Sequence, residues 1–149
     1  TRVGSKSFLV VANSSASPER VWELLADATS WPRWSRVPAA RYKREGEPAP
    51  HGVGAIRDFG AGPVHSFEEV ILFDPPRHFA YQLLSGLPID GYCADVQLIP
   101  VGSGTRIEWA GTFDAKPRFL GSFWKFVLAR ILIRGLANSL SKAAESSES

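Results

Sequence analysis

Cysteine is nearly absent from this chain, because Cys93 is the only one among its 149 residues. A single cysteine excludes an internal disulfide and is typical of a reducing compartment. No apolar run reaches the ~18 residues that a membrane-spanning helix needs, and no charged segment followed by an apolar run indicates a signal peptide. The sequence therefore predicts a cytoplasmic location.

The chain also lacks a large excess of charge of one sign, since 17 basic and 15 acidic residues leave a net charge of +2. This excess does not argue for nucleic-acid binding, and neither an RNA-binding aromatic motif nor zinc-ligand spacing accompanies it. The chain lacks a G-x-S-x-G elbow, an H-E-x-x-H pair and a Walker loop, and GVGAIRDFG lacks the strand–loop–helix context of a dinucleotide site. We therefore expect no metal, no cofactor and no nucleic-acid partner.

What is present is the composition of one globular domain, with 44% hydrophobic residues. A strand-like run over residues 5–15 precedes a helix signal, in which Ser17 is the expected N-cap and Pro18 the first helical residue. A second short helix can restart around Pro32. Six strand-like runs then follow at intervals typical of an antiparallel meander, near 38–45, 53–59, 64–73, 77–85, 91–100 and 104–114. One long helix is expected from Pro117 to about Ala144.

Three stretches of sequence, SPERVWELLADATSWPRWS, FDPPRHFAY and GTRIEW, occur in this order before the long terminal helix. On these motifs and this order of elements, the chain resembles the START-like (SRPBCC, helix-grip) superfamily, in its polyketide cyclase/dehydratase-like branch. The resemblance covers nearly the whole chain. It implies an α+β helix-grip fold, in which a curved seven-stranded antiparallel sheet wraps around the C-terminal helix. The expected division is one START-like ligand-binding domain over residues 1–145 and a disordered tail over 146–149.

The resemblance also implies an apolar cavity, closed at one end by the two short helices that carry Trp31 and Trp34. Ordinary core packing is the alternative for both tryptophans, because tryptophan is highly buried on average. We expect a cavity of ~300 to 1,000 Å³, the usual size for small ligands. Its expected ligand contacts are Trp34, Arg57, Phe67, Glu69, Phe79, Tyr81, Tyr92, Trp109, Phe123, Val127 and Ile131.

Strand register predicts which side chains share a face. A tight turn within FGAGPV places Arg57 opposite His65 or Phe67, and the hairpin across FDPPR places Glu69 opposite Tyr81. All five then share one face of the sheet. In the last two strands, period two predicts an inward-facing set comprising Tyr92, Ala94, Val96, Leu98, Ile107, Trp109 and Phe113.

The polar members of this predicted face allow two interpretations. Inside a cavity, Glu69 would hold Arg57 in place for a ligand carbonyl or carboxylate. On the outer face the two would form an ordinary cross-strand pair, which contributes roughly 0.2 to 1 kcal/mol. His65, Glu69 and Tyr81 are the candidates for acid–base catalysis. Cys93, on the predicted outer face and without a histidine partner, is expected to be inert.

The terminal helix carries six basic residues between Asp114 and Glu145 and no acidic one. Its polar face changes sides along its length, so Phe119, Phe123 and Trp124 cannot all face the sheet. Either the helix bends, or an aromatic and basic patch remains for peripheral membrane contact or a homodimer partner.

Three classes of function follow. The favoured one is a binding or carrier protein for a hydrophobic small molecule, lipid or polyketide-like, in an internal cavity, since an apolar lining comes without an evident catalytic constellation. The alternatives are a cyclase/dehydratase-type enzyme that uses cavity His, Glu or Tyr on a polyketide-like substrate, and a protein or membrane interaction module that uses the C-terminal helix.

Overall fold

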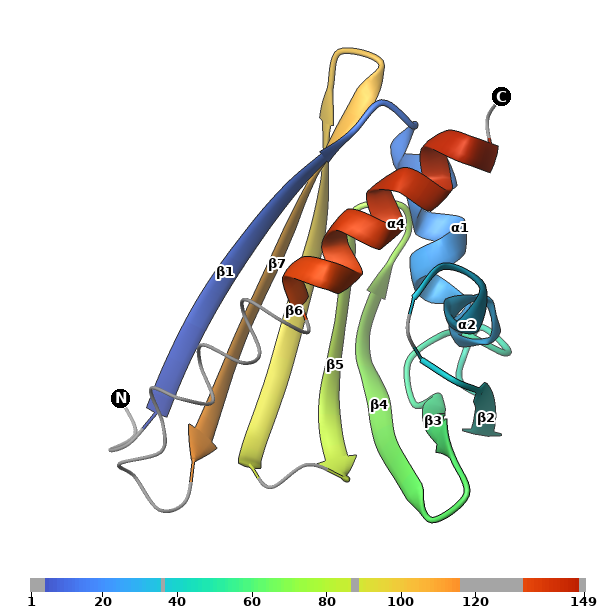
Figure 1. The fold of residues 1–149 in the computed structure, drawn as a ribbon, viewed down its shortest axis with the longest axis vertical. Coiled ribbons are helices and arrows are strands. Elements are labelled where there is room, and N and C mark those ends of the chain that lie inside the picture. The colour runs from blue at the N-terminus through green and yellow to red at the C-terminus, as the bar shows by residue number, and fades with distance from the viewer. Residues whose placement is uncertain (1–4, 36, 87–88, 116–132, 148–149) are drawn as a thin grey trace.

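The computed structural model describes residues 5–35, 37–86, 89–115 and 133–147. Seven strands form one sheet, and Figure 1 shows it curving around the side on which the helices α1 and α4 lie. The elements are β1 (Ser5–Ser14), α1 (Pro18–Ala26), the 3₁₀ turn η1 (Ala28–Ser30), α2 (Trp31–Trp34), β2 (Ala40–Arg44), β3 (Ile56–Ala61), β4 (Val64–Asp74), β5 (His78–Ser85), β6 (Ile89–Val101), β7 (Gly104–Ala115) and α4 (Arg134–Ser147).

The strand order is β1-β7-β6-β5-β4-β3-β2, and every neighbouring pair is antiparallel. From β2 to β7 each strand pairs with the next one in the chain, and β1 closes the order by pairing with the last strand. Two short helices follow β1, and a helix ends the described chain. The predicted α+β helix-grip architecture is therefore confirmed, while residues 116–132 of the expected long helix lie outside the described residues.

The first helix begins where the sequence predicts. The hydroxyl of Ser17 accepts a hydrogen bond from the backbone N–H of Arg20, and Pro18 occupies the first turn. Val21, Leu24 and Leu25 are buried on one side of α1. Helical spacing thus gives α1 an apolar stripe that packs on the sheet.

The last helix is fixed to the first strand by reciprocal hydrogen bonds. The hydroxyl of Ser14 donates to the carbonyl of Ser141 (3.1 Å), and the hydroxyl of Ser141 donates to the carbonyl of Asn13 (2.7 Å). The backbone N–H of Ser15 also donates to the carboxylate of Glu145 (2.8 Å). These contacts hold α4 against the end of β1, on the concave side of the sheet (Figure 1).

The inward-facing set predicted for β6 and β7 is confirmed, because all its members are buried: Tyr92, Ala94, Val96, Leu98, Ile107, Trp109 and Phe113. The alternating Cys93 and Asp95 are more accessible. Period-two alternation therefore identifies the concave face of these strands correctly.

The register predicted for the β3–β4 hairpin is wrong by one residue. Arg57 pairs with Glu68, and neither His65 nor Phe67 lies opposite it. The turn contains two residues, Gly62 and Pro63, so an odd-numbered residue pairs with an even-numbered one. Gly62 has φ +59°, the left-handed conformation that glycine favours in tight two-residue turns.

The register predicted for Glu69 in the next hairpin is wrong for a different reason. Near the turn Asp74 pairs with His78, which agrees with the expected parity. A β-bulge between Val70 and Leu72 then shifts the register, so that Val70 lies opposite Tyr81 and Glu69 lies opposite Gln82. A bulge sends the following side chains to the other face, which moves Glu69 to the outer side.

Candidate functional site

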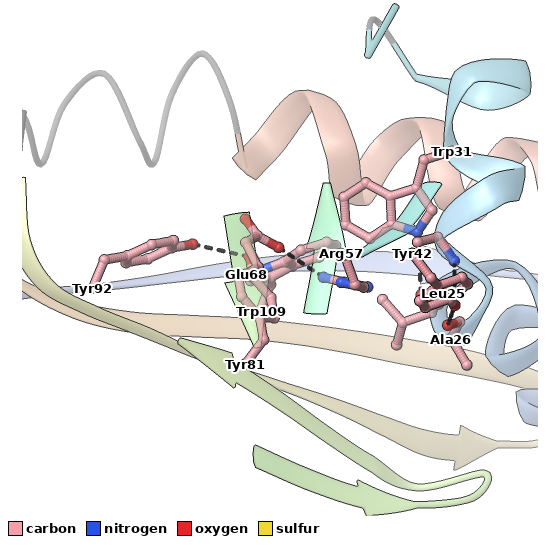
Figure 2. Close-up of polar contacts among 10 residues, drawn as sticks. Leu25, Ala26, Trp31, Tyr42, Arg57, Glu68, Tyr81, Tyr92 and Trp109 are labelled. Atoms are coloured by element: carbon pink, nitrogen blue, oxygen red, sulfur yellow. Dashed lines mark hydrogen bonds and ion pairs between the residues drawn. The ribbon is translucent and has the colours of Figure 1, made fainter. Parts of the chain in front are cut away.

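The centre of the concave face holds a buried ion pair. Arg57 has no exposed surface, and its Nη2 donates a hydrogen bond to Oε1 of Glu68 at 2.8 Å. The side chain of Glu68 is 13% exposed. Figure 2 shows the two side chains pointing toward each other from β3 and β4. The pairing of these strands thus brings one cation and one carboxylate to the inner side of the sheet.

Aromatic rings surround the guanidinium of Arg57. Its Cζ lies 4.8 to 5.1 Å from the ring centroids of Trp31, Phe59, Phe79 and Tyr81. Such cation–π contacts stabilise a guanidinium that has lost its water. They do not replace hydrogen bonds, and Nε and Nη1 of Arg57 have no hydrogen-bond partner within the described part of the chain. Buried N–H groups without partners are rare and costly, by ~1 to 3 kcal/mol each.

Glu68 is the acidic member of this site. Burial raises the pKa of its carboxyl above the ordinary value, and this outweighs the attraction of the Arg57 guanidinium, which lowers it. Burial disfavours the ionised form because a low-dielectric interior solvates the charge poorly. Glu68 therefore holds a proton to higher pH than an exposed glutamate does.

A pair of tyrosines lies beside the ion pair. The hydroxyl oxygens of Tyr81 and Tyr92 are 3.0 Å apart, and Nε1 of Trp109 donates to the hydroxyl of Tyr81 at 3.3 Å (Figure 2). Burial is the main cause that raises the pKa of both phenols, so both remain protonated. Their mutual hydrogen bond uses one of two hydroxyl hydrogens, which leaves one donor without an acceptor among the described residues.

The two tryptophans that follow α1 lie at one end of this site. Trp31 is buried and packs on Phe59 and Trp109, with ring centroids 4.9 and 6.1 Å away, while its Nε1 donates to the carbonyl of Leu25. Trp34 is half-buried, with its ring 5.0 Å from that of Trp31. Trp31 is thus a core residue that also contacts Arg57.

Tyr42 fixes the same end of the sheet to the helices. Its hydroxyl accepts a hydrogen bond from the backbone N–H of Ala28 (3.0 Å) and lies 3.2 Å from the carbonyl of Ala26 and 2.6 Å from Nδ1 of His51. Because Tyr42 pairs with Arg57 in the β2–β3 register, the tyrosine, shown in Figure 2, also faces inward.

Three of the residues predicted for the site lie on the outer face. Nδ1 of His65 is 2.6 Å from Oδ1 of Asp58, and its Nε2 is 2.8 Å from the carbonyl oxygen of Gly62. Burial alone would raise the pKa of Asp58, but hydrogen bonds from His65 and Arg41 hold it below the ordinary value. Two open hollows of about 320 and 480 Å³ adjoin Asp58. Asp58 follows the inward-facing Arg57 in β3 and so points to the opposite face, and because His65 bonds Asp58, the sheet separates His65 from the buried ion pair.

Glu69 and Phe67 share that outer face. Glu69 accepts hydrogen bonds from Nη2 of Arg44 and from Nε2 of Gln82, both at 3.1 Å. The ring of Phe67 lies under the ammonium group of Lys43, 4.7 Å from its nitrogen. Neither residue contributes to the inner site. Their predicted placement beside Arg57 followed from the register errors in the two hairpins.

The remaining predicted contacts divide into two groups. Phe79, Tyr81, Tyr92 and Trp109 are buried on the inner face. Phe123, Val127 and Ile131 lie outside the described residues, so the cavity that they were expected to complete stays a prediction. Glu68 is a polar inner residue that the sequence analysis did not single out, and the two-residue turn of Gly62 and Pro63 is the signal that would have found it.

The described ranges contain no group of three or more histidine, cysteine and acidic side chains that could hold a metal ion. Within them no helix is both long and apolar enough to cross a membrane.

The chain matches the protein family described as polyketide cyclase/dehydrase and lipid transport over residues 7–148, and it belongs to this family. Two uncharacterized proteins, from Mycobacterium bovis and Mycobacterium tuberculosis, are each 28% identical to it over 104 residues. The match covers 68% of this chain and 62% of each relative, so the chain spans less than two thirds of their length.

Solved structures share the fold across most of the chain. A START superfamily protein from Mycobacterium smegmatis has a TM-score of 0.80 at 14% identity, covering 95% of this chain and 98% of that one. Norcoclaurine synthase from Thalictrum flavum, in complex with dopamine and hydroxybenzaldehyde, has a TM-score of 0.72 at 19% identity, covering 97% and 89%. Family and fold together support a hydrophobic ligand-binding fold of the START type.

Proposed function

We propose that this protein is a carrier for a hydrophobic small molecule, which binds against the concave face of the sheet with its polar end at the Arg57–Glu68 pair. The functional unit is one START-like domain over residues 1–145, and its expected location is cytoplasmic. The family description, which includes lipid transport, supports this proposal.

One observation carries the proposal. Arg57 is fully buried among aromatic rings, yet Nε and Nη1 lack hydrogen-bond partners in the described chain. Burying these two unpartnered N–H groups costs the fold free energy, because each forfeits its bonds to water and the aromatic rings do not replace hydrogen bonds. A binding site gains specificity from them, since a few polar groups on an apolar surface orient the ligand.

A second candidate is a cyclase/dehydratase-type enzyme. The observation that favours it is a carboxyl with a raised pKa beside the hydroxyls of Tyr81 and Tyr92. Such a carboxyl keeps its proton to higher pH than an exposed glutamate does, as a general acid requires. Glu68 and Tyr81 would act in it, whereas the sequence-based candidates His65 and Glu69 lie on the outer face. The interaction-module alternative depends mainly on helix residues outside the described ranges.

The test begins with the purified protein and the apolar dye Nile red. We expect saturable Nile red binding, and native mass spectrometry should detect an apolar molecule retained from the expression host. Absence of both would contradict the proposal.

Variants then separate a carrier from an enzyme. The Arg57→Gln variant should retain less of the molecule found by mass spectrometry, whereas the exposed control Arg44→Gln should retain the wild-type amount. Release of that molecule unchanged supports a carrier. Its conversion by the wild-type protein but not by Glu68→Gln would favour the enzyme instead.

A further inference from the structure

The hydrogen-bonding groups left without partners in the inner site specify what its ligand must offer. Among the residues that the structure describes, Nη1 of Arg57 and one hydroxyl hydrogen of the Tyr81–Tyr92 pair are donors without acceptors. Glu68 accepts the hydrogen bond from Arg57 through Oε1, which leaves Oε2 for another donor, and the side chain is 13% exposed. The site therefore offers free donors and one free carboxylate oxygen. A complementary ligand group needs a hydrogen-bond acceptor for these N–H and O–H donors, and a hydrogen-bond donor for the carboxylate oxygen of Glu68.

The charge balance limits the choice further. One guanidinium and one carboxylate, 2.8 Å apart, already neutralise each other. An additional anion would leave an unbalanced buried charge, and so would a cation, at a cost that burial makes large. The group that enters must therefore be neutral, or must arrive with a proton. Among neutral groups with one acceptor and one donor, a carboxyl forms the strongest pair with a carboxylate, because O–H···O⁻ bonds are short and charge-assisted.

We propose that the polar end of the ligand is a carboxylic acid, which accepts a hydrogen bond from Nη1 of Arg57 and shares one proton with Oε2 of Glu68. This inference depends on the proposed function and names the chemical class of its ligand. Two carboxyl groups with one proton carry a single negative charge, which Arg57 balances. At a pH where the free acid and Glu68 are both ionised, binding takes up one proton from the solvent.

The other groups around Glu68 do not titrate in the same way. Arg57 faces it from β3, and the phenols of Tyr81 and Tyr92 face it from β5 and β6. A guanidinium stays charged, and both phenols have a pKa raised by burial. Among the residues that the structure describes, the shared proton therefore belongs to Glu68 and the ligand.

The experiment compares three probes with the same chain: dodecanoic acid, dodecanamide and dodecanol. Their affinities are measured by displacement of Nile red from pH 6 to 9.5. We expect the affinity for the acid to fall about tenfold per pH unit over part of this range, because one proton is linked to binding. The affinities for the amide and the alcohol should stay nearly constant.

Two neighbouring variants form a matched pair. Glu68→Gln removes the carboxyl that shares the proton and keeps an acceptor for Nη2 of Arg57, so the affinity for the acid should lose its pH dependence. Glu69→Gln removes the adjacent carboxyl on the outer face and should keep the wild-type profile. As controls, the circular dichroism spectrum and the Nile red affinity of each variant should match those of the wild type, which would establish that the fold and the apolar site are intact.

The outcomes distinguish this inference from the proposed function. If the acid shows the same pH profile as the amide, or if Glu68→Gln keeps the steep profile, the shared proton is refuted. If the alcohol displaces Nile red and the acid does not at any pH, the ligand class is wrong and the carrier function stands. If Nile red itself does not bind, the carrier function fails together with the inference.

Discussion

Replacing Arg57 with methionine should destabilise the protein far more than the same change at Arg44. The two arginines pair with adjacent glutamates on opposite faces of β4. Arg57 has no exposed surface and Glu68 is 13% exposed, whereas Arg44 and Glu69 are 57% and 26% exposed. Breaking a buried pair leaves an uncompensated charge and costs ~3 to 5 kcal/mol. An exposed pair contributes ~0 to 1 kcal/mol.

Urea denaturation followed by tryptophan fluorescence measures this difference in unfolding free energy. Thermal denaturation followed by the same signal gives the corresponding difference in Tm. In a chain of about this length, 1 kcal/mol changes Tm by ~2 to 4 °C. The Tm should therefore fall by roughly 6 to 20 °C for Arg57→Met and by less than about 4 °C for Arg44→Met. Equal losses in the two variants would refute the inner placement of the Arg57–Glu68 pair.

The cost of Arg57→Met should also grow with pH. Removing the cation that lowers the pKa of Glu68 raises that pKa further. When a carboxyl has a higher pKa in the folded protein than in the unfolded protein, its contribution to stability is fully present at pH values below the unfolded pKa, here 4.5. That contribution is lost as the pH rises through the folded pKa. The variant and the wild type should therefore be closest in stability at low pH. A difference that shrinks as pH rises would contradict this assignment.

Three further predictions follow from other contacts. In the wild type, the unfolding free energy contributed by Glu68 should decline as pH rises above 4.5, and Glu68→Gln should flatten this part of the pH profile in urea denaturation; an unchanged profile would contradict the raised pKa. Tyr81→Phe removes the hydroxyl to which Nε1 of Trp109 donates at 3.3 Å and should cost ~0.5 to 1.5 kcal/mol by the same assay, whereas no loss would argue against that hydrogen bond. Ser141→Ala removes the hydroxyl that bonds the carbonyl of Asn13 and should cost about 1 kcal/mol, with faster amide exchange in α4; unchanged exchange would count against its role.

The order of elements was predictable because each boundary has a local physical signal. Ser17 and Pro18 give the start of the first helix, and their roles depend only on neighbouring residues. The alternation in β6 and β7 is equally local, since side chains along a strand point to alternate faces. Tyr92 and Trp109 could therefore be assigned to the inner face without knowing the register.

The partner of Arg57 does not follow from local alternation alone, because pairing depends on the number of residues in a turn and on bulges. The sequence prediction assumed an odd number of residues in the turn at Gly62, and it therefore placed Glu69 on the inner face of the sheet and Glu68 on the outer face. An error of one residue in the register moves each side chain to the opposite face. The bulge after Val70 has no clear sequence signal. The polar centre of the site thus depends on non-local geometry, although its aromatic surroundings could be predicted.

The most direct test of the central claim is an NMR titration of the protein with dodecanoic acid. It observes the side-chain N–H signals of the buried Arg57 guanidinium and of the Trp109 indole, with the exposed Arg44 as an internal reference. If the ligand binds on the concave face with its polar end at the ion pair, the Arg57 and Trp109 signals should shift in a saturable manner while the Arg44 signal stays in place. Shifts at Arg44 and other outer-face residues, with Arg57 and Trp109 unchanged, would contradict the account.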